Sequence, residues 1–97
     1  MKTFYLKVHE SVKGRIVSIC DKDILGKVFE ENEVELNVSE KFYKGNLVDE
    51  EEIIKIIKNE RNINLVGENT IKIAEKLDLA ENIKTIKNIP YMEIFEV

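Results

Sequence analysis

The stretch from Asp49 to Glu60, DEEEIIKIIKNE, carries the clearest structural signal in the chain and predicts a helix over residues 50–60. Asp49 is a favourable N-cap, and Glu52 follows three residues later, as in a capping box. The acidic residues of the first turn place negative charge at the positive end of the helix dipole. The isoleucines that follow form one broad apolar stripe, so the helix is expected to pack against other elements through that face.

The N-terminal part of the chain predicts two strands. Residues 3–9 alternate between apolar and polar side chains, which is the period of a half-buried strand. Residues 15–20, RIVSIC, are richer in β-branched and apolar residues, as is typical of a central strand. The segment between them, SVKG at 11–14, supplies turn chemistry. We therefore expect these two strands to form a β-hairpin.

The remaining elements are weaker in the sequence but complete its order. We expect a short helical turn over residues 21–26, capped by Asp21, and a third strand over 33–38. A loop over 39–45 follows, in which Phe42 and Tyr43 cover the core. A connection at 63–67 then leads to a second helix over 68–77 and to two C-terminal strands over 83–87 and 91–97. This order predicts an α+β fold: a small domain with an N-terminal β-hairpin and further strands packed against two helices.

Length and composition narrow the class of protein. A chain of 97 residues with 43% hydrophobic residues is the size of one domain, over residues 1–97. It has no apolar run long enough for a membrane helix and no secretory h-region, so we expect a cytoplasmic protein. One cysteine excludes an internal disulfide and a cysteine-rich zinc site. The net charge of −4 argues against a nonspecific nucleic-acid binder.

Catalytic and ligand-binding patterns are weak. If His9 lies opposite Gly14 across the hairpin, the only cysteine, Cys20, lies opposite Thr3, about 20 Å from that histidine. A Cys–His dyad is then out of reach. The consecutive glutamates at 50–52 point in different directions around a helix and cannot converge on one metal ion. The glycines form no nucleotide-binding pattern. We therefore predict no catalytic, cofactor-binding or metal-binding residue, with Cys20 buried and His9 facing solvent.

Lysines and one aromatic pair are the candidate partner contacts. Phe42 and Tyr43 could stack on a base while the adjacent Lys44 touches a phosphate, as in single-strand binders. Further lysines on the second helix and near the C-terminal strands could form a basic face, namely Lys72, Lys76, Lys84 and Lys87. The alternative is ordinary structure, in which Phe42 and Tyr43 divide between the core and its edge and the lysines belong to a solvated surface.

Five stretches together resemble a small archaeal family known as domain of unknown function 424: KVHE (7–10), VSICDKDILGK (17–27), VSEKFYKG (38–45), NLVGE (64–68) and IPY (89–91). The resemblance covers nearly the whole chain in matching order and spacing. It implies an archaeal, cytosolic, single-domain protein without an assigned activity, with a loose association to genes of translation. Family members usually carry histidine after the C-terminal proline, where this chain has Tyr91.

Three functional hypotheses follow. The first is a noncatalytic protein-binding or adaptor module whose partner is another protein or a second copy of this chain, because the sequence shows no convergent catalytic side chains and mixes both signs of charge. The second is an RNA-associated accessory factor of the translation apparatus, contacted through Tyr43 and the lysines. An enzyme is the least favoured class. We expect no cofactor and no membrane partner.

Overall fold

The structure is a computed structural model that describes residues 3–95 of the 97-residue chain. Its strands and helices are, in chain order, β1 (Phe4–Ser11), β2 (Gly14–Asp21), the 3-10 turn η1 (Lys22–Ile24), β3 (Val28–Glu31), β4 (Val34–Asn37), α1 (Glu40–Tyr43), β5 (Asn46–Val48), α2 (Glu50–Asn59), β6 (Asn62–Val66), α3 (Glu68–Lys76), β7 (Lys84–Ile86) and β8 (Ile89–Phe95). The predicted α+β fold class is confirmed.

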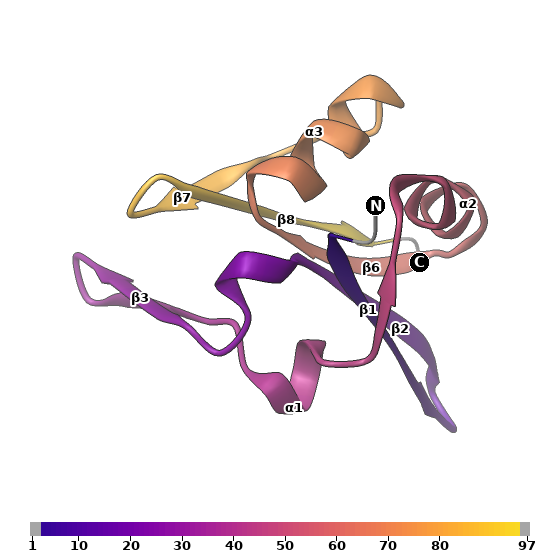
Figure 1. The fold of residues 1–97 in the computed structure, drawn as a ribbon, viewed down its shortest axis with the longest axis horizontal. Helices are drawn as coiled ribbons and strands as arrows, with labels where there is room; N and C mark the ends of the chain where they lie inside the picture. Colours follow the sequence, from indigo (N-terminus) through magenta and orange to yellow (C-terminus); the bar gives the residue numbers. More distant parts are fainter. Residues whose placement is uncertain (1–2, 96–97) are drawn as a thin grey trace.

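One six-stranded sheet organises the chain, with strand order β5-β1-β2-β6-β8-β7. Only the central pair, β2 and β6, is parallel, and the other neighbours are antiparallel. The crossover between these two strands contains η1, the separate β3–β4 hairpin, α1, β5 and α2. The sheet therefore lies between two layers, with α2 and α3 on one face and α1 with the β3–β4 hairpin on the other (Figure 1).

Each face of the sheet has its own hydrophobic core, because side chains alternate along every strand. The first core joins the sheet to α2 and α3 through buried residues that include Val17, Ile19, Leu65, Ile53 and Ile73. The second core is smaller and lies on the opposite face, where β2 and β6 end. Its buried members are Cys20, Ile24, Val38, Tyr43 and Val66.

The predicted cap of α2 is confirmed. Asp49 Oδ1 accepts a hydrogen bond from the Glu52 backbone N–H at 3.0 Å. Ile53 and Ile57 on the apolar stripe are buried in the first core, and the acidic first turn is exposed. The local pattern thus fixes both where the helix begins and which face it buries.

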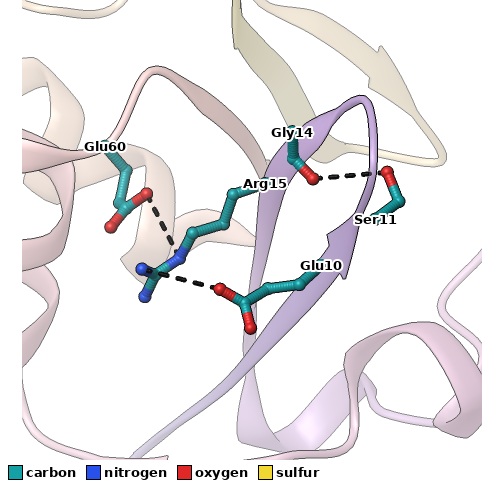
Figure 2. A network of polar contacts seen from close by, with 5 residues as sticks. All are labelled: Glu10, Ser11, Gly14, Arg15 and Glu60. Atoms are coloured by element: carbon teal, nitrogen blue, oxygen red, sulfur yellow. Dashed lines mark hydrogen bonds and ion pairs between the residues drawn. The ribbon is translucent and has the colours of Figure 1, made fainter.

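Arg15 links the β1–β2 hairpin to the residue that ends α2. Its guanidinium lies 4.0 Å from the Glu10 carboxylate across the hairpin and 3.6 Å from that of Glu60 (Figure 2). At the tip of the hairpin, the Ser11 hydroxyl donates to the Gly14 carbonyl at 3.3 Å. Because Arg15 is half-exposed, we expect these ion pairs to orient the hairpin more than to stabilise it.

Several expectations about strands were wrong. Cys20 lies opposite Tyr5 and His9 opposite Ile16, so the predicted hairpin register is shifted by two residues. Cys20 and His9 are still four strand positions apart, about 14 Å. The expected connection at 63–67 is largely the central strand β6, and β3 and β5 were not predicted. The last predicted strand begins earlier, at Ile89, and its residues 96–97 lie outside the described range.

Candidate functional site: the free edge of strand β8

Tyr43, the aromatic residue proposed to meet RNA, is a core residue. Its side chain is only 7% exposed, in the second core, and burial raises its pKa to about 12. The neighbouring Phe42 is half-buried and stacks on His9, with ring centroids 4.5 Å apart. The two aromatics thus divide between the core and its edge, so the Tyr43 ring does not offer a stacking surface.

The structure does not bring the candidate lysines together on one surface. Lys72 and Lys76 belong to α3, on the first-core face of the sheet, and Lys76 Nζ pairs with Glu50 at 3.2 Å. Lys44 follows α1 on the opposite face. Lys84 and Lys87 belong to the β7–β8 hairpin at the sheet edge. A contact of these residues with a partner stays a prediction.

His9 and Ser18 lie close together but hold α1 in place. His9 Nε2 lies 2.9 Å from the Phe42 carbonyl oxygen and 3.3 Å from Ser18 Oγ. The buried Ser18 hydroxyl donates to the same carbonyl at 2.5 Å, so it is not poised as a nucleophile. The expectation that His9 faces solvent was wrong, because this carbonyl and the Phe42 ring bring the imidazole over the sheet.

Cys20 is buried as predicted. Its side chain is fully inaccessible in the second core. Burial, followed by the nearby Asp21 charge, raises the pKa of the thiol to about 12. Since the thiolate is the reactive form of cysteine, this environment suits a packing residue and disfavours a nucleophile.

Asp21 caps a helix that is distant in sequence. We expected it to cap η1, but its side chain makes no bond to that turn. Its carboxylate instead accepts hydrogen bonds from the backbone N–H groups of Asn69 and Thr70, at 3.0 and 2.8 Å, and from both of their side chains. The prediction was wrong because β2 and β6 pair in parallel, so that the start of α3, which follows β6, lies beside the end of β2. Two of the amides that the N-terminus of α3 could offer to an anion are therefore already used by Asp21.

The edge of β8 is left open over part of its length. β8 pairs with β6 through residues 62–66, whereas β7 pairs only with Ile89, Pro90 and Tyr91. Strand β7 is three residues long and β8 seven, so the outer side of residues 92–95 faces no strand among the described residues.

The backbone direction of this edge follows from the turn of the β7–β8 hairpin and from one hydrogen bond between Gly67 and Pro90. Ile86 and Ile89 flank a two-residue turn, so Ile89 points its N–H and C=O toward β7. Pro90 points the other way, and its carbonyl accepts from the Gly67 N–H at 2.9 Å. Because the direction alternates along a strand, Glu93 and Phe95 point their N–H and C=O groups away from β6. No hydrogen bond among the described residues uses these groups.

A groove runs along this open edge. One hollow of about 180 Å³ is lined by Glu81, Asn82, Lys84, Tyr91, Met92 and Glu93. A second, of about 330 Å³, shares four of these residues and continues along Asp78, Leu79, Ile94 and Phe95. The loop that joins α3 to β7 lines this groove, with left-handed backbone at Asp78 and Asn82. We call the two hollows together the β8 edge groove.

The groove combines apolar surface with negative charge. Phe95 is 72% exposed and Leu79 is 40% exposed. Three acidic residues line it, Asp78, Glu81 and Glu93, against one basic residue, Lys84. The sequence predicted strands over 83–87 and 91–97 but not their pairing, and it is the short pairing of β7 with residues 89–91 alone that leaves the edge open.

No group of three or more His, Cys, Asp or Glu side chains among residues 3–95 is placed to hold a metal ion. No helix within the same range is long and apolar enough to cross a membrane.

These features define a small α+β domain built on a mixed six-stranded sheet, in which the short outer strand β7 leaves part of β8 uncovered. The chain belongs to the family described as protein of unknown function (DUF424), which it matches over residues 9–97. Every buried residue of the second core falls within the stretches 17–27, 38–45 and 64–68 that carry the resemblance in sequence.

A solved structure shares this fold. It is described as an uncharacterized conserved protein from Methanopyrus kandleri, and it matches with a TM-score of 0.73 and 23% sequence identity. The match covers 95% of this chain and 91% of that one, so nearly every element has a counterpart. Comparison with curated proteins gives no match.

Proposed function

We propose that this protein is a noncatalytic binding module that receives an extended segment of another protein as an added strand on β8. The observation that carries the proposal is the pair of backbone positions, Glu93 and Phe95, that no hydrogen bond within residues 3–95 uses. Unpaired strand edges bind extended peptides through main-chain hydrogen bonds, while side-chain pockets supply selectivity. The β8 edge groove offers both features in one place.

Strand β1 offers a contrasting edge. Beyond its pairing with β5, which ends at Leu6, its outer side is also unpaired among the described residues. That stretch, Lys7–Ser11, is mostly polar, and Lys7 Nζ is engaged with the Lys41 carbonyl of α1. The apolar side chains and the groove are at β8, so we place the binding site there.

The remaining chemistry of the chain fits a binding role in a reducing compartment. The only cysteine is a buried free thiol, and its high pKa keeps it protonated at neutral pH. Proteins with free thiols are typical of the cytoplasm, where we place this module. Among the described residues the one Ser–His approach holds α1 and leaves no hydroxyl poised to react.

The test is the variant Glu93→Pro. Proline has no N–H, and the N–H of Glu93 points to the open side, so the ladder with β6 is kept while one docking donor is removed. Glu93→Gln is the matched control, because it removes the charge but keeps the donor. Ile94→Pro should unfold β8, because the N–H of Ile94 points toward β6.

The variants are compared by affinity capture from native extract, with and without nuclease. We expect the bound proteins to be lost with Glu93→Pro and to remain, at least in part, with Glu93→Gln. Unchanged capture by a folded Glu93→Pro protein would overturn the proposal. Bound material that disappears on nuclease treatment, and that Glu93→Pro does not alter, would support the RNA-associated role instead.

A further inference from the structure

We infer that the segment received by the β8 edge groove is cationic, with a lysine or arginine beside Glu93 and an apolar residue two positions along, beside Phe95. This inference rests on the proposed function, since it names the partner of that site. It follows from the charge of the groove, from the direction of its side chains and from the apolar surface between them.

The charge of the groove is one-sided. Asp78, Glu81 and Glu93 line it, and Lys84 lies at the end where β7 already occupies the edge. No ion pair among the described residues neutralises these three carboxylates. Opposite charges on neighbouring strands attract and like charges directly opposite repel, so a positively charged strand fits here.

The spacing of the side chains sets the pattern of the segment. Glu93 lies opposite Asn64 and Phe95 opposite Asn62, so the side chains of both residues project from the second-core face of the sheet. The residue between them, Ile94, packs against the first core. An added strand follows the same period of two, which places a cationic and an apolar residue at alternate positions on that face.

The same charges disfavour two other occupants. A second copy of this chain would bring three more carboxylates, those of Asp78, Glu81 and Glu93, against the same groove and only one cation, Lys84. A nucleic-acid backbone would meet the same repulsion, strengthened by the net charge of −4. A cationic protein segment avoids both penalties.

The probe is a labelled peptide, acetyl-Thr-Lys-Thr-Val-Thr-Lys-Thr-Val-amide, compared with the version in which glutamate replaces both lysines. Binding is followed by fluorescence anisotropy at low and moderate salt. We expect the lysine peptide to bind at least about tenfold more tightly than the glutamate peptide at low salt, and this preference to shrink as salt screens the charges. Glu93→Gln should reduce the preference several-fold, and Glu93→Pro should abolish binding of either peptide.

The outcomes separate this inference from the proposed function. Equal binding of both peptides, lost in Glu93→Pro, would overturn the cationic partner and leave strand addition intact. No binding of either peptide, or binding that Glu93→Pro does not change, would overturn strand addition itself. A dimer in analytical ultracentrifugation that Glu93→Pro dissociates would identify a second copy as the occupant and overturn the inference.

Discussion

The carboxylate of Asp21 fills the space that a side chain at Gly67 would need. A Cβ at residue 67 would lie 2.4 Å from Asp21 Cγ, and the glycine has φ of +112°. The approach is close because Asp21 ends β2 and Gly67 directly follows the parallel neighbour β6, where α3 begins. The absence of a side chain at one position therefore allows the other to cap the helix.

We expect Gly67→Ala to lower the free energy of unfolding by about 3 kcal/mol, because it combines a backbone conformation unfavourable to alanine with a steric clash. Gly26→Ala is the control: its φ is +85°, but nothing lies within 4 Å of its added Cβ. That variant should lose only about 1 kcal/mol. Chemical denaturation measures both values, and equal losses would show that contact with Asp21 is unimportant.

Asp21→Asn should lower the free energy of unfolding by about 2 kcal/mol. Asparagine retains one acceptor oxygen, whereas both oxygens of the buried carboxylate accept bonds from Asn69 and Thr70. The exposed Asp23 makes no such bonds, so Asp23→Asn should change stability by less than about 0.5 kcal/mol. Similar denaturation midpoints for the two variants would contradict this assignment.

Asp49→Ala should cost about 1 kcal/mol, the usual value for removing an N-cap side chain. The bond lost is the one from the Glu52 N–H to the Asp49 carboxylate, at 3.0 Å. Glu51→Ala is the control, since it changes charge in the same turn without removing a cap. An unchanged denaturation midpoint for Asp49→Ala, accompanied by loss of a bound partner, would show that Asp49 serves binding and not stability.

Cys20 should resist thiol reagents in the native state at neutral pH. The side chain is inaccessible, and its pKa of about 12 leaves almost no thiolate. Labelling should therefore wait for opening of the structure and accelerate on addition of denaturant. Rapid labelling of the native protein would contradict this view, and a parallel measurement on fully unfolded chain gives the reference rate.

Stability should fall at alkaline pH. Burial raises the pKa of Cys20 from 9.0 and that of Tyr43 from 10.0, each to about 12, so the unfolded chain loses these protons first. The native state then binds more protons, and the free energy of unfolding decreases as pH rises above 9, by about 1.4 kcal/mol per unit for each group fully ionised only in the unfolded state. Tyr43→Phe should flatten this decrease between pH 10 and 12, which denaturation at several pH values can measure. An equal slope in the variant would contradict it.

Elements that local sequence determines were predictable, and elements that depend on pairing with distant residues were not. Asp49 and Glu52 define the start of α2 within four residues of chain. In contrast, β6 reads as a short connection, because Asn62 and Asn64 interrupt its apolar residues and only pairing with β2 and β8 makes it a central strand. The bond between Asp21 and α3 joins residues almost fifty positions apart, and no local pattern announces it.

The candidate site was missed for a related reason. Proline and alternating residues indicated strands near Ile86 and Ile89, yet the turn between them, Lys87-Asn88, uses left-handed backbone without a glycine to mark it. The register of the hairpin, and with it the unpaired side of Glu93, could not be read from composition. Lysines suggest a partner by their residue type, which the sequence displays. The open edge is a property of backbone pairing, which the sequence does not display.

The parallel pairing of β2 with β6 has a consequence for how the chain acquires its fold. The two centre strands meet only after everything from η1 to α2 has been made, so the sheet depends on closing a long loop. Chains dominated by such distant pairings fold slowly, in about milliseconds to seconds. During synthesis the side of β2 that pairs with β6 stays unpaired until residues 62–66 have left the ribosome, and an unpaired strand edge favours aggregation of the nascent chain.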